Sequence, residues 1–230
     1  MEAKISEIFT SHQGEGPFAG SRQLFVRFYG CNLNCVYCDT DLTSYKTFSP
    51  EGLLGKILDF EEDYNELSVT GGEPLLYADF LRVFLPMFKK YNDKKKVYLE
   101  TNGTLPKEFL KIKDLIDIVA MDIKLPSSDR NTKDHWAEHE EFIKLLSKEE
   151  TIIKAVITDS TTIDDIKEMG RILSCLDKSA AVVLQPVTPG EGSQGEADEE
   201  MLSFFKRYLE KEVGRQTSVI GQIHKCLGIR

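Results

Sequence analysis

The stretch Arg22-Gln-Leu-Phe-Val-Arg27-Phe-Tyr-Gly30-Cys31-Asn-Leu-Asn-Cys35-Val-Tyr-Cys38 places three cysteines directly after a segment of aromatic and β-branched residues. That segment predicts a β-strand, and the cysteines occupy the loop that follows it. Thiolates are soft ligands for iron-sulfur clusters and zinc, and a site filled by protein alone takes four ligands. This loop offers three. It therefore predicts a 4Fe-4S cluster on Cys31, Cys35 and Cys38, with one iron left open to another ligand.

A zinc site is the alternative for this cysteine loop. It would need a fourth ligand from the remaining histidines and cysteines, which are His12, His135, His139, His224, Cys175 and Cys226. None of these residues lies at finger-like spacing from the loop. The sequence therefore favours the cluster and keeps zinc as the minor interpretation.

The composition predicts a globular protein that acts on a small molecule. The 230 residues are 41% hydrophobic and 29% charged, without a linker or repeat, so we expect a single domain, 1–230, that includes an N-terminal substrate and cluster segment, 1–45. The net charge of −9 argues against a nucleic-acid partner. No apolar stretch is long enough for a membrane span, and no leader segment is evident, so we expect a cytoplasmic protein without a membrane partner.

Strand-like and helix-like segments alternate along the chain, which is typical of βα units around a parallel sheet. The expected strands are 22–29, 67–70, 97–101, 116–123, 152–158, 181–185 and 217–220. The expected helices are 50–60, 77–91, 133–147, 162–176 and 196–212. Ser49 can cap the first helix with Pro50 at its first position, and Pro86 predicts a kink or break in the second.

Polar motifs follow these strands at their carboxyl ends. They are the cysteine loop, Thr70-Gly71-Gly72-Glu73-Pro74, Glu100-Thr101-Asn102-Gly103, Asp122-Ile-Lys124-Leu-Pro126-Ser127 and Gln185-Pro186. In barrels and open α/β sheets the carboxyl ends of the strands meet at one rim, where ligands bind. The sequence therefore predicts one site on that rim, built from loops that are far apart in the chain.

The cysteine loop together with Gly71-Gly72-Glu73-Pro74 resembles the radical S-adenosylmethionine enzymes. Two glycines leave backbone exposed, and the Glu73 carboxylate can accept hydrogen bonds from an ammonium group. The resemblance implies that the open iron binds the methionine part of S-adenosylmethionine. It also implies an α/β fold, an incomplete TIM-like (β/α) barrel of the radical S-adenosylmethionine type, with about six or seven βα units.

A second set of residues points to one family within the radical S-adenosylmethionine enzymes. The strings Gln13-Gly14-Glu15-Gly16, Phe25-Val26-Arg27, Gly30-Cys31-Asn32-Leu33 and Cys38-Asp39-Thr40 are similar to those of the 7-carboxy-7-deazaguanine synthases, carbon-nitrogen lyases of deazapurine and queuosine biosynthesis. The resemblance covers nearly the whole chain. It implies that S-adenosylmethionine yields a 5′-deoxyadenosyl radical, which starts the ring contraction of 6-carboxy-5,6,7,8-tetrahydropterin to 7-carboxy-7-deazaguanine with loss of ammonia.

The same resemblance implies a role for each matching residue. The pterin would be bound by Gln13, Gly14, Glu15, Arg27, Thr70, His224 and, through the chain end, Arg230. S-adenosylmethionine would be bound by Tyr37, Cys38, Asp39, Gly72, Glu73, Ser127 and Gln185. Thr40 would bind Mg²⁺, with Asp39 as a weaker candidate. The family also implies an electron donor such as flavodoxin or ferredoxin, and a homodimer.

Other residues receive structural expectations. His135 and His139 lie on a polar helical stretch and are expected to be exposed, whereas Cys175 and Cys226 are expected to be buried or half-buried thiols without a metal. Lys154 could face the barrel interior, but the sequence does not decide it. Trp136 receives no function.

Two other functions remain open on the sequence alone. A glycyl-radical-type activating enzyme would use the same cofactors on a protein partner, but it would lack the segment from Gln13 to Arg27. A non-catalytic metal-binding or electron-transfer module would need a fourth cysteine ligand, and it gives Gly71 to Pro74 no purpose.

Overall fold

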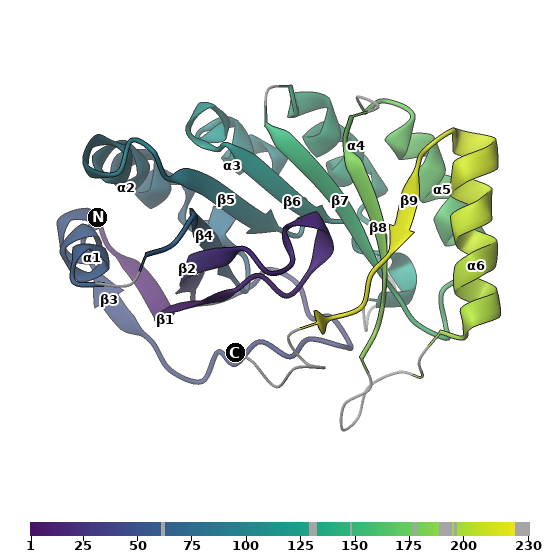
Figure 1. Cartoon of the computed structure of the whole chain (residues 1–230), viewed down its shortest axis with the longest axis horizontal. Coiled ribbons are helices and arrows are strands. Elements are labelled where there is room, and N and C mark those ends of the chain that lie inside the picture. Colours follow the sequence, from purple (N-terminus) through teal and green to yellow (C-terminus); the bar gives the residue numbers. More distant parts are fainter. Residues whose placement is uncertain are drawn as a thin grey trace.

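The computed structural model describes residues 1–60, 63–128, 133–147, 149–176, 179–188, 195 and 197–223. Within these residues nine strands form one curved sheet with helices along its outer side (Figure 1). The strands are β1 (Ala3–His12), β2 (Arg22–Phe28), β3 (Lys46–Phe48), β4 (Glu66–Gly71), β5 (Lys96–Thr101), β6 (Ile118–Asp122), β7 (Glu150–Ile157), β8 (Ala181–Pro186) and β9 (Thr217–Val219). The helices are α1 (Pro50–Leu58), α2 (Ala78–Tyr91), α3 (Pro106–Leu110), α4 (Trp136–Leu145), α5 (Ile163–Leu173) and α6 (Glu199–Tyr208), with a π-helical turn after α6 at Leu209–Val213.

The sheet is open and mostly parallel. Its strand order is β3-β1-β2-β4-β5-β6-β7-β8-β9. From β2 onward each strand pairs in parallel with the next in this order, and one of the helices α1 to α6 stands between each two in sequence. β1 pairs antiparallel with β2, and β3 pairs antiparallel with β1. The described strands therefore form an incomplete barrel with six βα units and a final strand, which confirms the predicted fold.

The helices bury their apolar faces against the outer side of the sheet. In α2, Phe80, Leu81, Phe84, Leu85 and Phe88 are at most 2% exposed. Their spacing places them on one face of a helix, and that face packs toward the sheet. The inner side of the sheet carries a separate small apolar cluster of Tyr98, Ile118, Ile152 and Val183. The main core therefore lies outside the sheet, which leaves the inner side free for polar groups.

All seven predicted strands and all five predicted helices are present. Ser49 caps α1 through a hydrogen bond from Gly52 N to its hydroxyl, 3.1 Å long, as expected. The break predicted at Pro86 does not occur, because α2 continues through the proline. The apolar residues on both sides of Pro86 are buried in the core and hold the helix there. β1, β3 and α3 were not predicted.

Two burial predictions were wrong. His135 and His139 are 4% and 0% exposed. They stand one helical turn apart and continue the buried face of Phe142 and Ile143, so they face the sheet rather than water. Cys175 is exposed, because it follows the end of α5. Cys226 lies outside the described residues.

None of the helices in the described ranges combines the length and the apolar composition that a membrane crossing requires.

Candidate active site

A cavity of about 300 Å³ opens on the inner side of the sheet at the carboxyl ends of the strands. The predicted site residues that line it are Gln13, Gly14, Glu15, Arg27, Cys31, Cys35, Tyr37, Cys38, Asp39, Thr40, Thr70, Gly72 and Gln185. They come from β2, β4 and β8 and from the loops after β1, β2 and β4. The single rim expected from the sequence is therefore observed, and it has the size of a small-molecule site.

The cysteine loop is fastened to the loop after β4 by backbone contacts. Gly72 N donates to Phe28 O at 3.1 Å, and Glu73 N donates to Gly30 O at 2.9 Å. A Cβ atom on Gly72 would clash with the Gly30 carbonyl and would stand 2.9 Å from Cys31 Cβ. Glycine is therefore required at position 72 by the close approach of the two loops.

Glu73 does not face the cavity. It is fully buried, and its carboxylate accepts hydrogen bonds from Leu75 N at 3.0 Å, Thr101 Oγ1 at 2.9 Å and Asn102 N at 2.8 Å. Burial raises its pKa to about 7, and these hydrogen bonds oppose the rise. Because the carboxylate is committed to the protein, the direct contact with S-adenosylmethionine expected for Glu73 has no support in this geometry.

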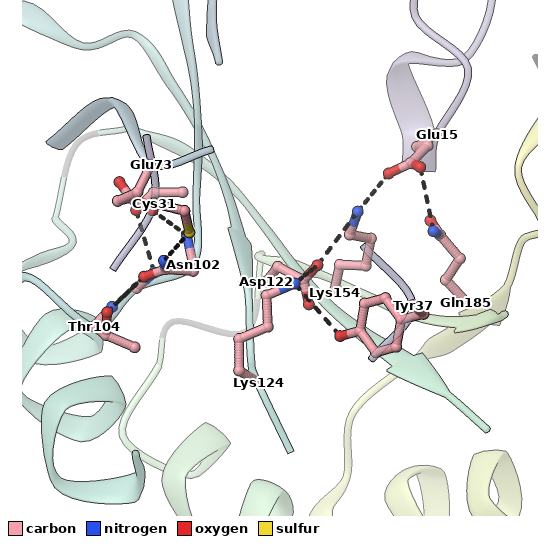
Figure 2. A network of polar contacts seen from close by, with 12 residues as sticks. Glu15, Cys31, Tyr37, Glu73, Asn102, Thr104, Asp122, Lys124, Lys154 and Gln185 are labelled. Atoms are coloured by element: carbon pink, nitrogen blue, oxygen red, sulfur yellow. Dashed lines mark hydrogen bonds and ion pairs between the residues drawn. The ribbon is translucent and has the colours of Figure 1, made fainter. Parts of the chain in front are cut away.

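Glu15 is the centre of a polar group on the other side of the cavity (Figure 2). Its carboxylate forms an ion pair with Lys154, and it accepts hydrogen bonds from Gln185 Nε2 at 3.2 Å and Gln222 Nε2 at 2.7 Å. Lys154 therefore faces the inside of the barrel, a point that the sequence left undecided. Burial opposes its charge, but Glu15 and Asp122 keep its pKa above the usual value of a lysine.

Asp122 links two lysines in the floor of the cavity (Figure 2). Its Oδ2 lies 2.8 Å from Lys124 Nζ and 3.6 Å from Lys154 Nζ. Lys124 Nζ also donates to the Tyr37 hydroxyl at 3.4 Å. Burial disfavours the charge on Lys124, but Asp122 and Tyr37 hold its pKa well above the usual value. Asp122 Oδ1 and Gln185 Oε1 are buried and accept no hydrogen bond from the described residues, so both can accept one from a ligand.

A third polar group combines β1, β4 and β5. Gln13 Nε2 donates to Glu100 Oε1 at 2.8 Å, and Thr70 Oγ1 donates to Glu100 Oε2 at 2.7 Å. Arg27, also on the cavity wall, donates through Nε to Glu7 at 3.2 Å, and its guanidinium lies 5.7 Å from the centre of the Phe9 ring. These contacts orient the side chains before any ligand arrives.

Besides Glu73, three predicted residues do not line the cavity or cannot be placed. Ser127 is half-buried, donates to Thr161 Oγ1 at 3.5 Å and is not among the lining residues. His224 and Arg230 lie outside the described residues.

Six further residues line the cavity, which are Glu100, Asn102, Asp122, Lys124, Lys154 and Gln222. The sequence placed Glu100, Asn102, Asp122 and Lys124 in motifs on the rim without a role for each, left Lys154 undecided, and gave no sign of Gln222. One signal was available for Lys154 and Asp122, because each is a charged residue within or at the end of an otherwise apolar strand. Such a residue is expected to face a polar site or a partner.

The three cysteines suit a cluster better than a single metal ion. Among the described residues, no three His, Cys, Asp or Glu side chains converge closely enough to hold one ion. A zinc ion draws its thiolates to roughly 2.3 Å, whereas the thiolates of a 4Fe-4S cluster bind different irons of a larger body. Burial raises the pKa of Cys35 to about 11, so uptake of a cluster releases its proton.

Comparison with known proteins shows the family to which the chain belongs. The model of the radical SAM superfamily matches residues 25–173. The chain is 31% identical to the 7-carboxy-7-deazaguanine synthase of Geobacter sulfurreducens, covering 98% of this chain and 97% of the relative. It is 35% identical to the enzyme of the same name from Methanothermobacter thermautotrophicus, covering 100% and 99%.

Solved structures show the same fold. QueE from Escherichia coli superimposes with a TM-score of 0.63 at 21% sequence identity, covering 97% of this chain and 95% of that one. A radical SAM methyltransferase from Sphaerobacter thermophilus superimposes with a TM-score of 0.60 at 13% identity, covering 93% and 77%.

Proposed function

The chain belongs to the radical SAM superfamily and, within it, to the 7-carboxy-7-deazaguanine synthases, and on this basis we propose that its cavity binds and contracts a carboxypterin. The reaction converts 6-carboxy-5,6,7,8-tetrahydropterin to 7-carboxy-7-deazaguanine with release of ammonia. The observation that carries the proposal is that the cysteine loop and the polar groups around Gln13, Glu15 and Arg27 line one cavity.

Cys31, Cys35 and Cys38 hold the 4Fe-4S cluster. All three belong to one loop on the cavity wall, and their thiolates leave one iron without a protein ligand. When bound, the cluster and S-adenosylmethionine supply the radical chemistry, while the protein binds and orients the substrate and excludes side reactions.

S-adenosylmethionine is bound by the residues of the cysteine loop and of the opposite wall. Tyr37, Cys38 and Asp39 contact it from the loop, and Gly72 and Gln185 contact it from the sheet. Gly72 supports this role because its backbone lies against the start of the cysteine loop. We assign Glu73 to positioning that loop through Asn102, and we keep Ser127 as a more distant contact.

The pterin is bound by Gln13, Gly14, Glu15, Arg27 and Thr70. Arg27 supplies a guanidinium for the substrate carboxylate, and its Nε contact with Glu7 fixes the direction of the remaining donors. Carboxylates such as Glu15 and Glu100 can accept hydrogen bonds from the N–H groups of a pterin ring. Lys154 holds Glu15 in place through their ion pair. His224 and Arg230, which lie outside the described residues, complete this set.

Thr40 binds Mg²⁺ together with substrate oxygens. Its hydroxyl is a hard oxygen ligand on the cavity wall, next to the exposed Asp39, which is a second candidate ligand. Mg²⁺ usually takes few protein ligands and completes its octahedron with water or substrate.

The remaining assignments concern the setting of the enzyme. The whole chain, 1–230, acts as one domain, and the segment 1–45 supplies the cluster loop and much of the substrate site. A one-electron donor such as flavodoxin or ferredoxin reduces the cluster, and the enzyme works as a homodimer in the cytoplasm. The reducing cytoplasm suits thiolate cluster ligands.

An anaerobic assay tests the function. Protein reconstituted with iron and sulfide is incubated with a reductant, S-adenosylmethionine, Mg²⁺ and the carboxytetrahydropterin, and we expect 7-carboxy-7-deazaguanine to form. Cys35→Ser should abolish cluster uptake and product, whereas the matched Cys175→Ser variant of an exposed thiol should keep both. Cluster-loaded protein that forms no deazaguanine acid would refute the assignment.

A further inference from the structure

The sulfur of Cys31 has two hydrogen-bond donors beside it. Asn102 Nδ2 lies 3.9 Å from Cys31 Sγ, and Leu33 N lies 3.4 Å from the same atom (Figure 2 shows the first contact). In the part of the chain that the structure describes, no hydrogen bond reaches the sulfur of Cys35 or Cys38. Cys31 is therefore the cluster ligand whose sulfur the protein surrounds with N–H groups.

The orientation of the Asn102 amide is fixed by chemistry. Thr104 N is only a donor, and it points at Asn102 Oδ1 from 3.0 Å. Thr104 Oγ1 donates to the same oxygen at 2.6 Å. Because Oδ1 must face these donors, Nδ2 must face Cys31, and a flipped amide would place two donors against each other.

The amide is also held against rotation. Asn102 Nδ2 donates a second hydrogen bond to Asn32 Oδ1 at 3.0 Å, and Asn32 Nδ2 donates to Thr104 Oγ1 at 2.8 Å. The three side chains thus close a ring in which each donor meets an acceptor. Asn102 and Thr104 are buried, whereas Asn32 is exposed, and a closed network in which every donor is satisfied keeps its geometry.

The backbone of Asn102 is anchored on both sides. Its N–H donates to Glu73 Oε2 at 2.8 Å, and its carbonyl accepts from His139 Nε2 at 3.0 Å. Glu73 and His139 are both fully buried. Apart from the positioning role given to Glu73, this group has no function so far, although it stands directly behind the cluster loop.

We infer that Asn102 is a positioning residue for the cluster, whose side-chain N–H bonds to the Cys31 thiolate, fixes that ligand and raises the reduction potential of the cluster. Glu73, His139 and Thr104 act through it by holding the amide in place. This inference rests on the proposed function, because it needs a cluster on Cys31.

The direction of the shift in reduction potential follows from the charge of the cluster. Reduction adds an electron to the cluster and increases the negative charge on its sulfur ligands. An N–H group aimed at a sulfur stabilises that charge more in the reduced state, and hydrogen bonds to the sulfurs are among the factors that set the potential. Loss of the amide N–H should therefore make the cluster harder to reduce.

The test compares two variants with the wild type after anaerobic reconstitution. Asn102→Ala removes the amide, and Asn102→Asp keeps its shape but removes the N–H donor. We expect both to have a more negative midpoint potential in a spectroscopic redox titration without S-adenosylmethionine. The expected size is about a tenfold fall in the ratio of reduced to oxidised cluster at a fixed potential, or about 59 mV for one electron.

Thr104→Val is the matched control. It removes a hydroxyl from the same ring, but Thr104 N still holds Asn102 Oδ1. We expect a potential equal to that of the wild type, with some loss of stability. An unchanged potential in either loaded Asn102 variant, or an equal shift in Thr104→Val, would overturn the inference.

A measurement on the wild type needs no substitution. In protein with side-chain ¹⁵N-labelled asparagine, pulsed electron paramagnetic resonance of the reduced cluster should show a coupled ¹⁵N nucleus, and its absence would also overturn the inference. Wild-type protein that takes up no cluster would instead refute the proposed function, so the two failures are distinguishable.

Discussion

Lys154 on β7 forms an ion pair with Glu15, which stands 139 residues earlier in the chain. The contact joins the loop after β1 to the far half of the sheet across the cavity. Lys154 Nζ also lies 3.6 Å from Asp122 Oδ2, so this ammonium group forms ion pairs with two carboxylates. The position of Glu15 against the substrate therefore depends on Lys154.

Replacing Lys154 by methionine should weaken substrate binding. The change keeps the length of the side chain but leaves Glu15 and Asp122 without their shared cation, and loss of one partner of a partly buried pair costs roughly 2 to 5 kcal/mol. We expect kcat/KM for the carboxypterin to fall at least about tenfold, with KM affected more than kcat. Steady-state kinetics measure this.

The control for Lys154 is Lys144→Met, which breaks the exposed pair with Glu140 on α4. Exposed pairs contribute little, so this variant should keep wild-type kinetics. Wild-type KM in Lys154→Met would contradict the role given to the Glu15 pair.

Gly72→Ala should disturb the cysteine loop. The added methyl group would clash with the Gly30 carbonyl and crowd Cys31, so the two loops must separate. We expect iron and sulfide content after reconstitution to fall several-fold, while circular dichroism still reports the wild-type helix content.

The contrasting variant is Gly55→Ala in α1, where nothing lies within 4 Å of the added atom. It should load normally and gain about 0.5 to 1 kcal/mol of stability. Normal loading of Gly72→Ala would show that the contact between the loops is dispensable.

Thr40→Ala should reduce the response to magnesium without loss of the cluster. The hydroxyl is the ligand that this chain offers to Mg²⁺ in our proposal, so its removal should raise the Mg²⁺ concentration for half-maximal activity about tenfold or more. Titration of Mg²⁺ in the anaerobic assay measures this. Thr47→Ala, on the exposed strand β3, should leave the titration unchanged. An identical curve for Thr40→Ala would remove Thr40 from the site.

His139 makes stability depend on pH. Burial lowers its pKa to about 4 in the folded protein, while an unfolded chain has the ordinary value near 6.5. Between these values the unfolded state binds a proton that the folded state does not, so the free energy of unfolding should decrease as pH falls from 6.5 to 4. For this one group the loss is on the order of 3 kcal/mol.

The test of His139 is denaturant unfolding at several pH values. His139→Gln keeps a donor for the Asn102 carbonyl but cannot titrate, so its stability should fall less than that of the wild type over this window. His135, Asp122, Lys124 and Glu73 stand nearby, and Glu73, whose raised pKa acts in the opposite direction, is present in both proteins. The difference between the two curves therefore reports His139, and parallel curves would refute its assignment.

The parallel part of the fold was predictable because each buried strand is a short run of β-branched and apolar residues between turn residues. β1 escaped prediction because its pairing with β2 shifts register between Ile5 and Glu7, which breaks the alternation of apolar and polar residues. β3 and α3 have three and five residues, which is too short for a periodic pattern.

The candidate site was predictable where a motif carries it, as at Cys31 to Thr40 and at Gln13 to Gly16. The other half of the site depends on contacts that cross the sheet. Lys154, Glu100 and Gln222 meet Glu15 or Gln13 only after the strands have paired. Glu73 shows what a motif alone does not reveal, since its carboxylate, expected to contact S-adenosylmethionine, accepts a hydrogen bond from Asn102 N instead. His135 and His139 were misjudged because histidine was counted as polar on a face that also carries Phe142 and Ile143.

In the proposed function, a cluster on three cysteines of this cavity cleaves S-adenosylmethionine for the ring contraction. The direct measurement is chromatographic quantification of 5′-deoxyadenosine and 7-carboxy-7-deazaguanine from one anaerobic reaction of reconstituted protein, with and without the carboxytetrahydropterin. We predict that both compounds form together and that the deazaguanine acid requires the pterin. Fully loaded protein that forms neither compound, or that carries a metal centre with four protein ligands, would contradict the account.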